Sequence, residues 1–157
     1  MNQDEICKAN ELFDEGLVSE LYEFIRPFLK INDPYALYFS SCFSLVEWNE
    51  SGEDFDRRNL DLLTKAAAAD VAPAMYLLSS SYFTGDTVKM DVQVGKSYLD
   101  RALELGYEPA KLAVGINYYY GSNGYPKDIE KALELVLDAE KNKVDGAAST
   151  LDHIQKN

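Results

Sequence analysis

Residues 74–85 read AMYLLSSSYFTG, and residues 110–121 follow the same pattern as AKLAVGINYYYG. In each stretch an alanine is followed after four residues by an aliphatic residue, after five by a small residue and after eight by a tyrosine. A glycine stands eleven residues after the alanine. These spacings place the side chains on one face of an α-helix, and glycine favours the left-handed backbone that ends a helix. The two stretches therefore predict two equivalent helices that end at Gly85 and Gly121.

The alanine recurs along most of the chain. Ala36, Ala74, Ala110 and Ala147 are 38, 36 and 37 residues apart. A repeat of this length is typical of helix pairs that stack side by side, each burying its apolar face against its neighbours. The sequence thus predicts an all-α solenoid of about four helix pairs with a C-terminal capping helix.

The repeat divides a single domain, residues 1–157, into units. We expect these at residues 4–33, 34–71, 72–107 and 108–145, with the cap over 146–157. Asp91 and Asp128 are expected to cap the second helices of the third and fourth units. The unit over residues 34–71 fits least, because serines replace its aliphatic, small and tyrosine residues. Its second helix is predicted over residues 60–70, after an inserted loop over residues 47–56.

These patterns resemble the Sel-one-like repeats, a family within the tetratricopeptide superfamily. The resemblance covers residues 34–157 and is strongest over residues 74–106 and 110–139. It implies a right-handed α-α superhelix in which the first helix of each unit lines a concave surface that binds other proteins.

Under that resemblance, the concave positions lie one residue before each repeat alanine and two, three, six, nine and ten after it. The predicted groove residues are Tyr35, Tyr38, Phe39, Tyr76, Ser80, Phe83, Leu112, Ile116, Tyr119 and Tyr120. Tyrosine combines a rigid apolar ring with a polar tip, and large aromatic residues dominate interface hot spots. The alternative is that some of these aromatic residues pack in the core.

The inserted segment, residues 47–56, is a second candidate contact. Its predicted binding residues are Glu47, Trp48, Glu50, Glu53, Asp54 and Asp56. The aromatic residues would anchor a basic protein surface while the carboxylates steer it. The alternative is a solvated loop whose Trp48 and Phe55 pack back onto the solenoid.

The chain is acidic, with a formal net charge of −12 and a pI near 4.4. This balance argues against nucleic-acid binding, which needs clustered lysine and arginine. Residues 1–72 hold 15 acidic and 6 basic residues, and residues 73–157 hold 12 and 9. A basic partner would be steered to the N-terminal half, although acidity also simply maintains solubility.

No apolar run is long enough for a membrane span, and the acidic N-terminal residues do not resemble an export signal. Cys7 and Cys42 are expected to be reduced thiols in a cytoplasmic protein.

Catalytic motifs are missing. The single histidine, His153, lies in the expected cap, and no metal, phosphate-loop or nucleophile motif occurs. We therefore expect no enzyme activity, cofactor or metal; a hydrolase using Asp128 and Glu130 is the least favoured alternative.

The sequence favours a protein-binding module. Its acidity suggests an inhibitor or immunity protein that neutralises a basic protein such as a toxin. The alternative is an adaptor that binds peptides or helices in its groove. The oligomeric state is not indicated.

Overall fold

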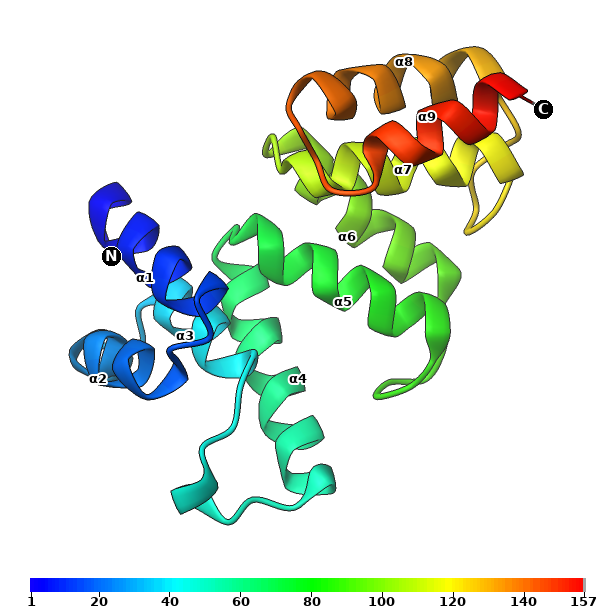
Figure 1. Cartoon of the computed structure of the whole chain (residues 1–157). Helices are drawn as coiled ribbons and strands as arrows, with labels where there is room; N and C mark the ends of the chain where they lie inside the picture. The colour runs from blue at the N-terminus through cyan, green and yellow to red at the C-terminus, as the bar shows by residue number, and fades with distance from the viewer. Residues whose placement is uncertain (157) are drawn as a thin grey trace. The chain divides into compact units, whose positions relative to one another are not determined.

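The computed structural model describes residues 1–156, and this part of the chain is all α-helical apart from turns, loops and one 3-10 turn (Figure 1). The elements are α1 (Gln3–Asp14), α2 (Val18–Leu29), α3 (Pro34–Ser41), the 3-10 turn η1 (Val46–Trp48), α4 (Gly52–Ala68), α5 (Ala72–Thr84), α6 (Val92–Glu104), α7 (Glu108–Tyr120), α8 (Ile129–Lys141) and α9 (Ala147–Lys156). The predicted all-α fold class is confirmed.

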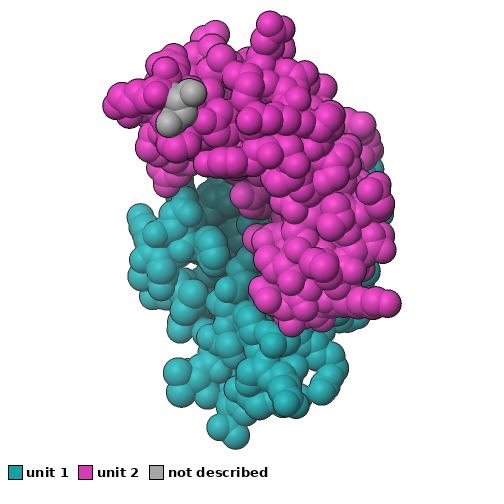
Figure 2. Space-filling model, turned by 90° about the vertical axis from the view of Figure 1, so that its right-hand side faces the viewer, with its two compact units in different colours: residues 1–74 teal, residues 75–157 magenta. Residues whose placement is uncertain are grey.

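The chain forms two compact units, which are described separately. Unit 1 comprises residues 1–74 and unit 2 residues 75–157 (Figure 2). In unit 1 the core is built by α1, α2 and α3, with Leu21 and Ile25 of α2 fully buried. In unit 2, α7 packs against α8 and α8 against α9.

The helix ends follow the predicted capping. Asp91 accepts hydrogen bonds from the backbone N–H groups of Gln93 and Val94, each at 3.0 Å. Asp128 caps α8 in the same way, through the N–H of Lys131 at 3.0 Å. Gly121 ends α7 with φ at 66°, a left-handed conformation that glycine adopts without strain.

The repeat alanines are fully buried. Ala36, Ala74, Ala110 and Ala147 are all 0% exposed. A small residue is also needed at Gly115 of α7, where an added Cβ would lie 2.8 Å from Cγ2 of Val136 on α8. A larger side chain at such a position would push the helices apart, which explains why the register could be read from small residues.

The unit over residues 34–71 departs from the prediction. Helix α3 ends at Ser41, and α4 begins at Gly52, eight residues before the predicted start at residue 60. Residues 52–56 are therefore helical, and the expectation of a loop over all of residues 47–56 is wrong. Ser51 caps α4 by accepting from the N–H of Asp54 at 3.1 Å, so the additional turns have a stable beginning.

Candidate binding groove

Three adjoining cavities of unit 2 lie along α5, α7 and α9. The largest, about 710 Å³, is lined by Tyr76, Leu112 and the 142–145 segment that precedes α9. A second cavity of about 210 Å³ lies around Ser80 and Phe83, and a third of about 230 Å³ lies between α7 and α9. We call this continuous set the α5–α7–α9 groove.

Ile116 of α7 is the residue that connects the groove, because it lines all three cavities. Tyr76 lines two of them, together with Ala113. The seven predicted groove residues that fall in unit 2 all line at least one cavity: Tyr76, Ser80, Phe83, Leu112, Ile116, Tyr119 and Tyr120. Their contact with a partner stays a prediction.

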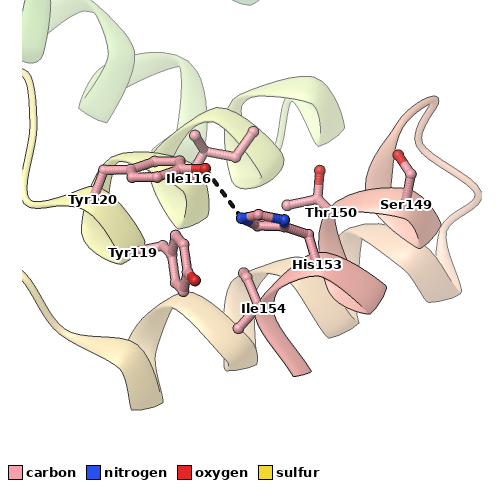
Figure 3. A pocket seen from close by; sticks show the side chains of 7 residues that line it. All are labelled: Ile116, Tyr119, Tyr120, Ser149, Thr150, His153 and Ile154. Carbon is pink, nitrogen blue, oxygen red and sulfur yellow. Dashed lines mark hydrogen bonds between the residues drawn. The ribbon is translucent and has the colours of Figure 1, made fainter. Parts of the chain in front are cut away.

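Helix α9 contributes residues to the groove that were not predicted from the sequence. Ser149, Thr150 and His153 line the third cavity beside Tyr119 and Tyr120 (Figure 3). These three residues stand two, three and six positions after Ala147, which are the offsets that identified the groove residues of earlier units. The register of the repeat therefore continues into α9.

Aromatic rings set the shape of the third cavity. The ring centroids of Tyr119 and Tyr120 are 4.8 Å apart, with an angle of 81° between the ring planes. Tyr119 meets the ring of His153 edge-on at 5.8 Å. The hydroxyl of Tyr120 lies 3.3 Å from Nε2 of His153. This hydrogen bond positions the Tyr120 side chain, although Tyr120 is 60% exposed.

The middle of the groove is fixed by a buried amide. The side-chain oxygen of Asn117 accepts from Oγ of Ser122 and from Nδ2 of Asn123, each at 3.0 Å. The same loop inserts Tyr125, whose hydroxyl donates to Asp100 of α6 at 2.7 Å. Burial first, and then this hydrogen bond, raises the pKa of Tyr125 above its ordinary value. These hydrogen bonds anchor the loop over residues 121–128, and Asn123 of this loop lines the groove.

Formal charges are sparse along the groove. Among the lining residues the carboxylates are Glu108 and Asp145 and the lysine is Lys143. The Glu108 carboxylate accepts hydrogen bonds from Nζ of Lys111 at 2.9 Å and from Nδ2 of Asn142 at 2.8 Å. The groove surface of this strongly acidic chain is therefore apolar, hydroxyl-rich and close to neutral.

The predicted groove residues of unit 1 lie differently. Phe39 is 1% exposed and belongs to the core, so its assignment to a partner-binding surface is wrong. Its ring packs within the core cluster of unit 1, with its centroid 6.4 Å from that of Phe13 in α1. Tyr35 and Tyr38 are half-buried and pack against the same core.

In the acidic segment, Trp48 and Glu50 face inward. The Trp48 ring stacks on Phe43 at 5.8 Å and meets Tyr22 edge-on at 5.3 Å. Arg58 of α4 lies 4.8 Å over the Trp48 ring and binds the Glu50 carboxylate, with Nε–Oε1 at 2.7 Å. This arrangement borders a cavity of about 530 Å³. Arg58 was not identified from the sequence, since its partners lie 8 to 18 residues away.

The remaining carboxylates of the segment are more exposed, although Asp54 also borders this cavity. Glu47, Glu53, Asp54 and Asp56 are exposed, and Asp54 pairs with Arg57 at 3.1 Å. Glu53 and Asp54 stand in the first turn of α4, where negative charge is favoured by the helix dipole. The structure therefore separates the six predicted residues into two inward and four exposed ones.

Residues 1–156 contain neither a candidate metal site nor a candidate membrane-spanning helix. Their histidine, cysteine, aspartate and glutamate side chains form no group of three or more that could hold a metal ion. None of the helices described combines the length and the apolar character needed to cross a membrane.

Residues 72–107 and 109–137 match the family model of the Sel1 repeat. No curated protein matches the chain. Among solved structures, a Sel1 repeat protein from Oxalobacter formigenes superposes with a TM-score of 0.59 and 23% identity over 80% of this chain and 35% of that one. A second structure is c5321, a protective antigen present in uropathogenic Escherichia coli strains that displays an SLR fold. It superposes with a TM-score of 0.64 and 17% identity over 93% of this chain and 40% of that one.

This chain therefore spans 35% and 40% of the length of the two structures. The likeness concerns the fold, and the matched repeats are of a type that generally forms protein-interaction modules. The resemblance predicted from the alanine register is confirmed over residues 72–107 and 109–137, which match the Sel1 repeat.

Proposed function

We propose that this chain is a non-enzymatic protein-binding module whose α5–α7–α9 groove receives a segment of a partner protein. The proposal rests on one observation: the residues predicted from the repeat register are also residues that line the cavities of unit 2. Residues chosen by their offset from the repeat alanines line three adjoining cavities. Concave surfaces that combine apolar walls with a few polar groups are the usual form of a binding site.

The lining indicates the chemistry of the segment. Tyr76, Phe83 and Ile116 offer apolar surface, and Ser80 offers a hydroxyl group for the backbone of a bound chain. Because charges are sparse there, the part of the segment over α5 and α7 is expected to be uncharged. Burying apolar side chains against these residues supplies the binding energy.

A photo-crosslinking residue placed at position 80 or at position 97 tests the groove. Both serines are exposed, but Ser80 lines the groove whereas Ser97 lies on α6 and lines none of the three cavities. Irradiation in cells that express the chain should give a covalent partner from position 80 and not from position 97. Replacing Ile116 with alanine should weaken the purified complex at least tenfold, because Ile116 borders all three cavities. Equal labelling at the two positions would contradict the proposal.

The second candidate function is an acidic inhibitor or immunity protein that neutralises a basic protein such as a toxin. One observation favours it. Within residues 1–74, all described by the structure, five of the six basic side chains already form ion pairs, while the same residues carry 15 acidic ones. Exposed carboxylates such as Glu47, Glu53 and Asp56 are left to attract a cationic surface. Such a role suits the cytoplasm, where Cys7 and Cys42, both free, would remain reduced.

Charge reversal distinguishes the two candidates once a partner is known. Replacing Glu47, Glu53 and Asp56 with lysine should slow association with a basic partner about tenfold at low salt. The control replaces Glu130, Glu134 and Glu140 on α8, which are also exposed. Glu50 is left unchanged because it binds Arg58. An association rate that responds equally to both sets would rule out a specific acidic contact.

A further inference from the structure

The cavity between α7 and α9, the α7–α9 pocket, differs from the rest of the groove in its polar atoms. Its walls are the rings of Tyr119, Tyr120 and His153 with the side chains of Ile116 and Ile154, and two hydroxyl groups of α9 face it (Figure 3). Its volume of about 230 Å³ suits one large side chain.

The hydroxyl groups of the pocket offer acceptors. Oγ of Ser149 donates its hydrogen to the carbonyl oxygen of Gly146 at 2.9 Å, and Oγ1 of Thr150 donates to the same oxygen at 2.8 Å. Each hydroxyl oxygen therefore has only lone pairs left for a ligand. When the Tyr120 hydroxyl donates to Nε2 of His153, its oxygen is in the same state.

The pocket also lacks a fixed cation. None of its seven lining residues is a lysine or an arginine. Residues 75–157 hold 12 acidic and 9 basic residues, so unit 2 has a small net negative charge, which does not oppose a cationic ligand. The ligand expected here donates several hydrogen bonds, stacks on aromatic rings and is positively charged.

We propose that the α7–α9 pocket binds the guanidinium group of an arginine side chain from the partner protein, an inference that rests on the proposed function of the groove. A guanidinium group is planar, carries five N–H donors and no acceptor, and stacks on aromatic faces. An ammonium group is more strongly hydrated and would lose its water without a carboxylate in return, since none lines the pocket. An apolar side chain would leave the hydroxyl oxygens without donors, which costs free energy.

The single histidine of the chain makes the pocket observable. His153 is the only source of imidazole ring signals in a proton NMR spectrum. We would titrate the protein with the blocked tripeptide acetyl-Gly-Arg-Gly-amide and with peptides carrying citrulline, lysine or leucine instead of arginine. The arginine peptide should shift the His153 signals saturably and bind about tenfold more tightly than the other three.

Two variants with matched controls assign the effect to the pocket. Tyr120→Phe keeps the ring but removes one acceptor, and Thr150→Val removes another. Each variant should weaken binding of the arginine peptide about fivefold and leave the affinity of the leucine peptide unchanged. Thr64→Val is the control, because Thr64 is exposed and back-bonds to Leu60 in α4 in the same way, at 2.7 Å. It should change neither affinity.

The outcomes separate this inference from the proposed function. Unmoved His153 signals, or a leucine peptide that binds as tightly as the arginine peptide, would overturn the arginine site. If position 80 still gives a crosslinked partner and position 97 does not, the groove remains a binding surface and only the arginine site is lost. If crosslinking fails as well, both proposals fail.

Discussion

Arg58 binds Glu50 through two parallel hydrogen bonds, with Nε–Oε1 at 2.7 Å and Nη2–Oε2 at 2.9 Å. The same guanidinium donates to the backbone carbonyls of Ser40 and Phe43, at 2.6 and 2.8 Å. The Ser40 carbonyl lies in the last turn of α3, where a helix leaves acceptors without partners, and the Phe43 carbonyl lies in the segment that follows α3. One side chain of α4 therefore both ends α3 and secures the irregular segment before α4.

Replacing Arg58 with alanine should lower the free energy of unfolding by about 2–3 kcal/mol, because two backbone carbonyls lose a charged donor. The matched control is Arg57→Ala, since Arg57 is the adjacent residue and makes only an exposed pair with Asp54, worth less than about 1 kcal/mol. Urea unfolding followed by the fluorescence of Trp48, the only tryptophan, measures both. Equal losses for the two variants would contradict the role of Arg58.

The Glu50 carboxylate should make stability depend on pH. Its hydrogen bond from Arg58 lowers its pKa to about 2 from an ordinary value of 4.5. A lowered pKa in the folded state means that the stabilisation is present above pH 4.5 and is lost as the pH falls towards 2. Urea midpoints measured between these limits should fall more steeply for the wild type than for Glu50→Gln. Equal slopes for the wild type and Glu50→Gln would contradict this role of the Glu50 carboxylate.

Tyr125→Phe should destabilise the protein by about 1–2 kcal/mol, because the buried hydroxyl donates to the charged Asp100. The raised pKa of Tyr125 has a second consequence: its hydroxyl should remain protonated where an ordinary tyrosine ionises. Ultraviolet titration should therefore show nearly the same number of ionising tyrosines near pH 10 before and after the substitution. Tyr119→Phe, by comparison, should have little effect on stability.

Adding a methyl group at Gly115 should be destabilising. An alanine Cβ there would lie 2.8 Å from Val136 and 3.3 Å from the carbonyl oxygen of Ala132. The cost of forcing α7 and α8 apart, about 1–3 kcal/mol, exceeds the gain in helix propensity of nearly 1 kcal/mol. Gly52→Ala, at the beginning of α4, meets no atom within 4 Å and should be neutral or stabilising. Thermal unfolding of the two variants compares them directly; a stable Gly115→Ala variant would contradict the tight packing.

The sequence predicted unit 2 well because close helix contacts admit only small residues. Ala110 and Gly115 stand where α7 meets its neighbours, so their spacing reveals which side of the helix is packed and which side faces the groove. Asp91 and Asp128 were predictable as caps for a similar reason, since capping depends on residues two or three positions away.

The segment between α3 and α4 could not be predicted in this way. Its order depends on Arg58, whose bond to Ser40 spans 18 residues and leaves no periodic signal. The first turns of α4 lack an apolar stripe as well and are supported by the Ser51 cap and by acidic residues near the helix N-terminus. Phe39 was misplaced because an offset alone does not show how deep a side chain lies.

The buried alanines have a consequence for how such a chain can change in size. Because Ala74 and Ala110 occupy equivalent, fully buried positions of the repeat, we expect that a whole unit can be duplicated while each helix pair keeps contacts of the same kind with its neighbours. A tandem copy of residues 72–107 should fold, and it should lengthen the binding surface by one helix. The reach of this surface therefore grows in whole units, and partner length can be matched by counting repeats.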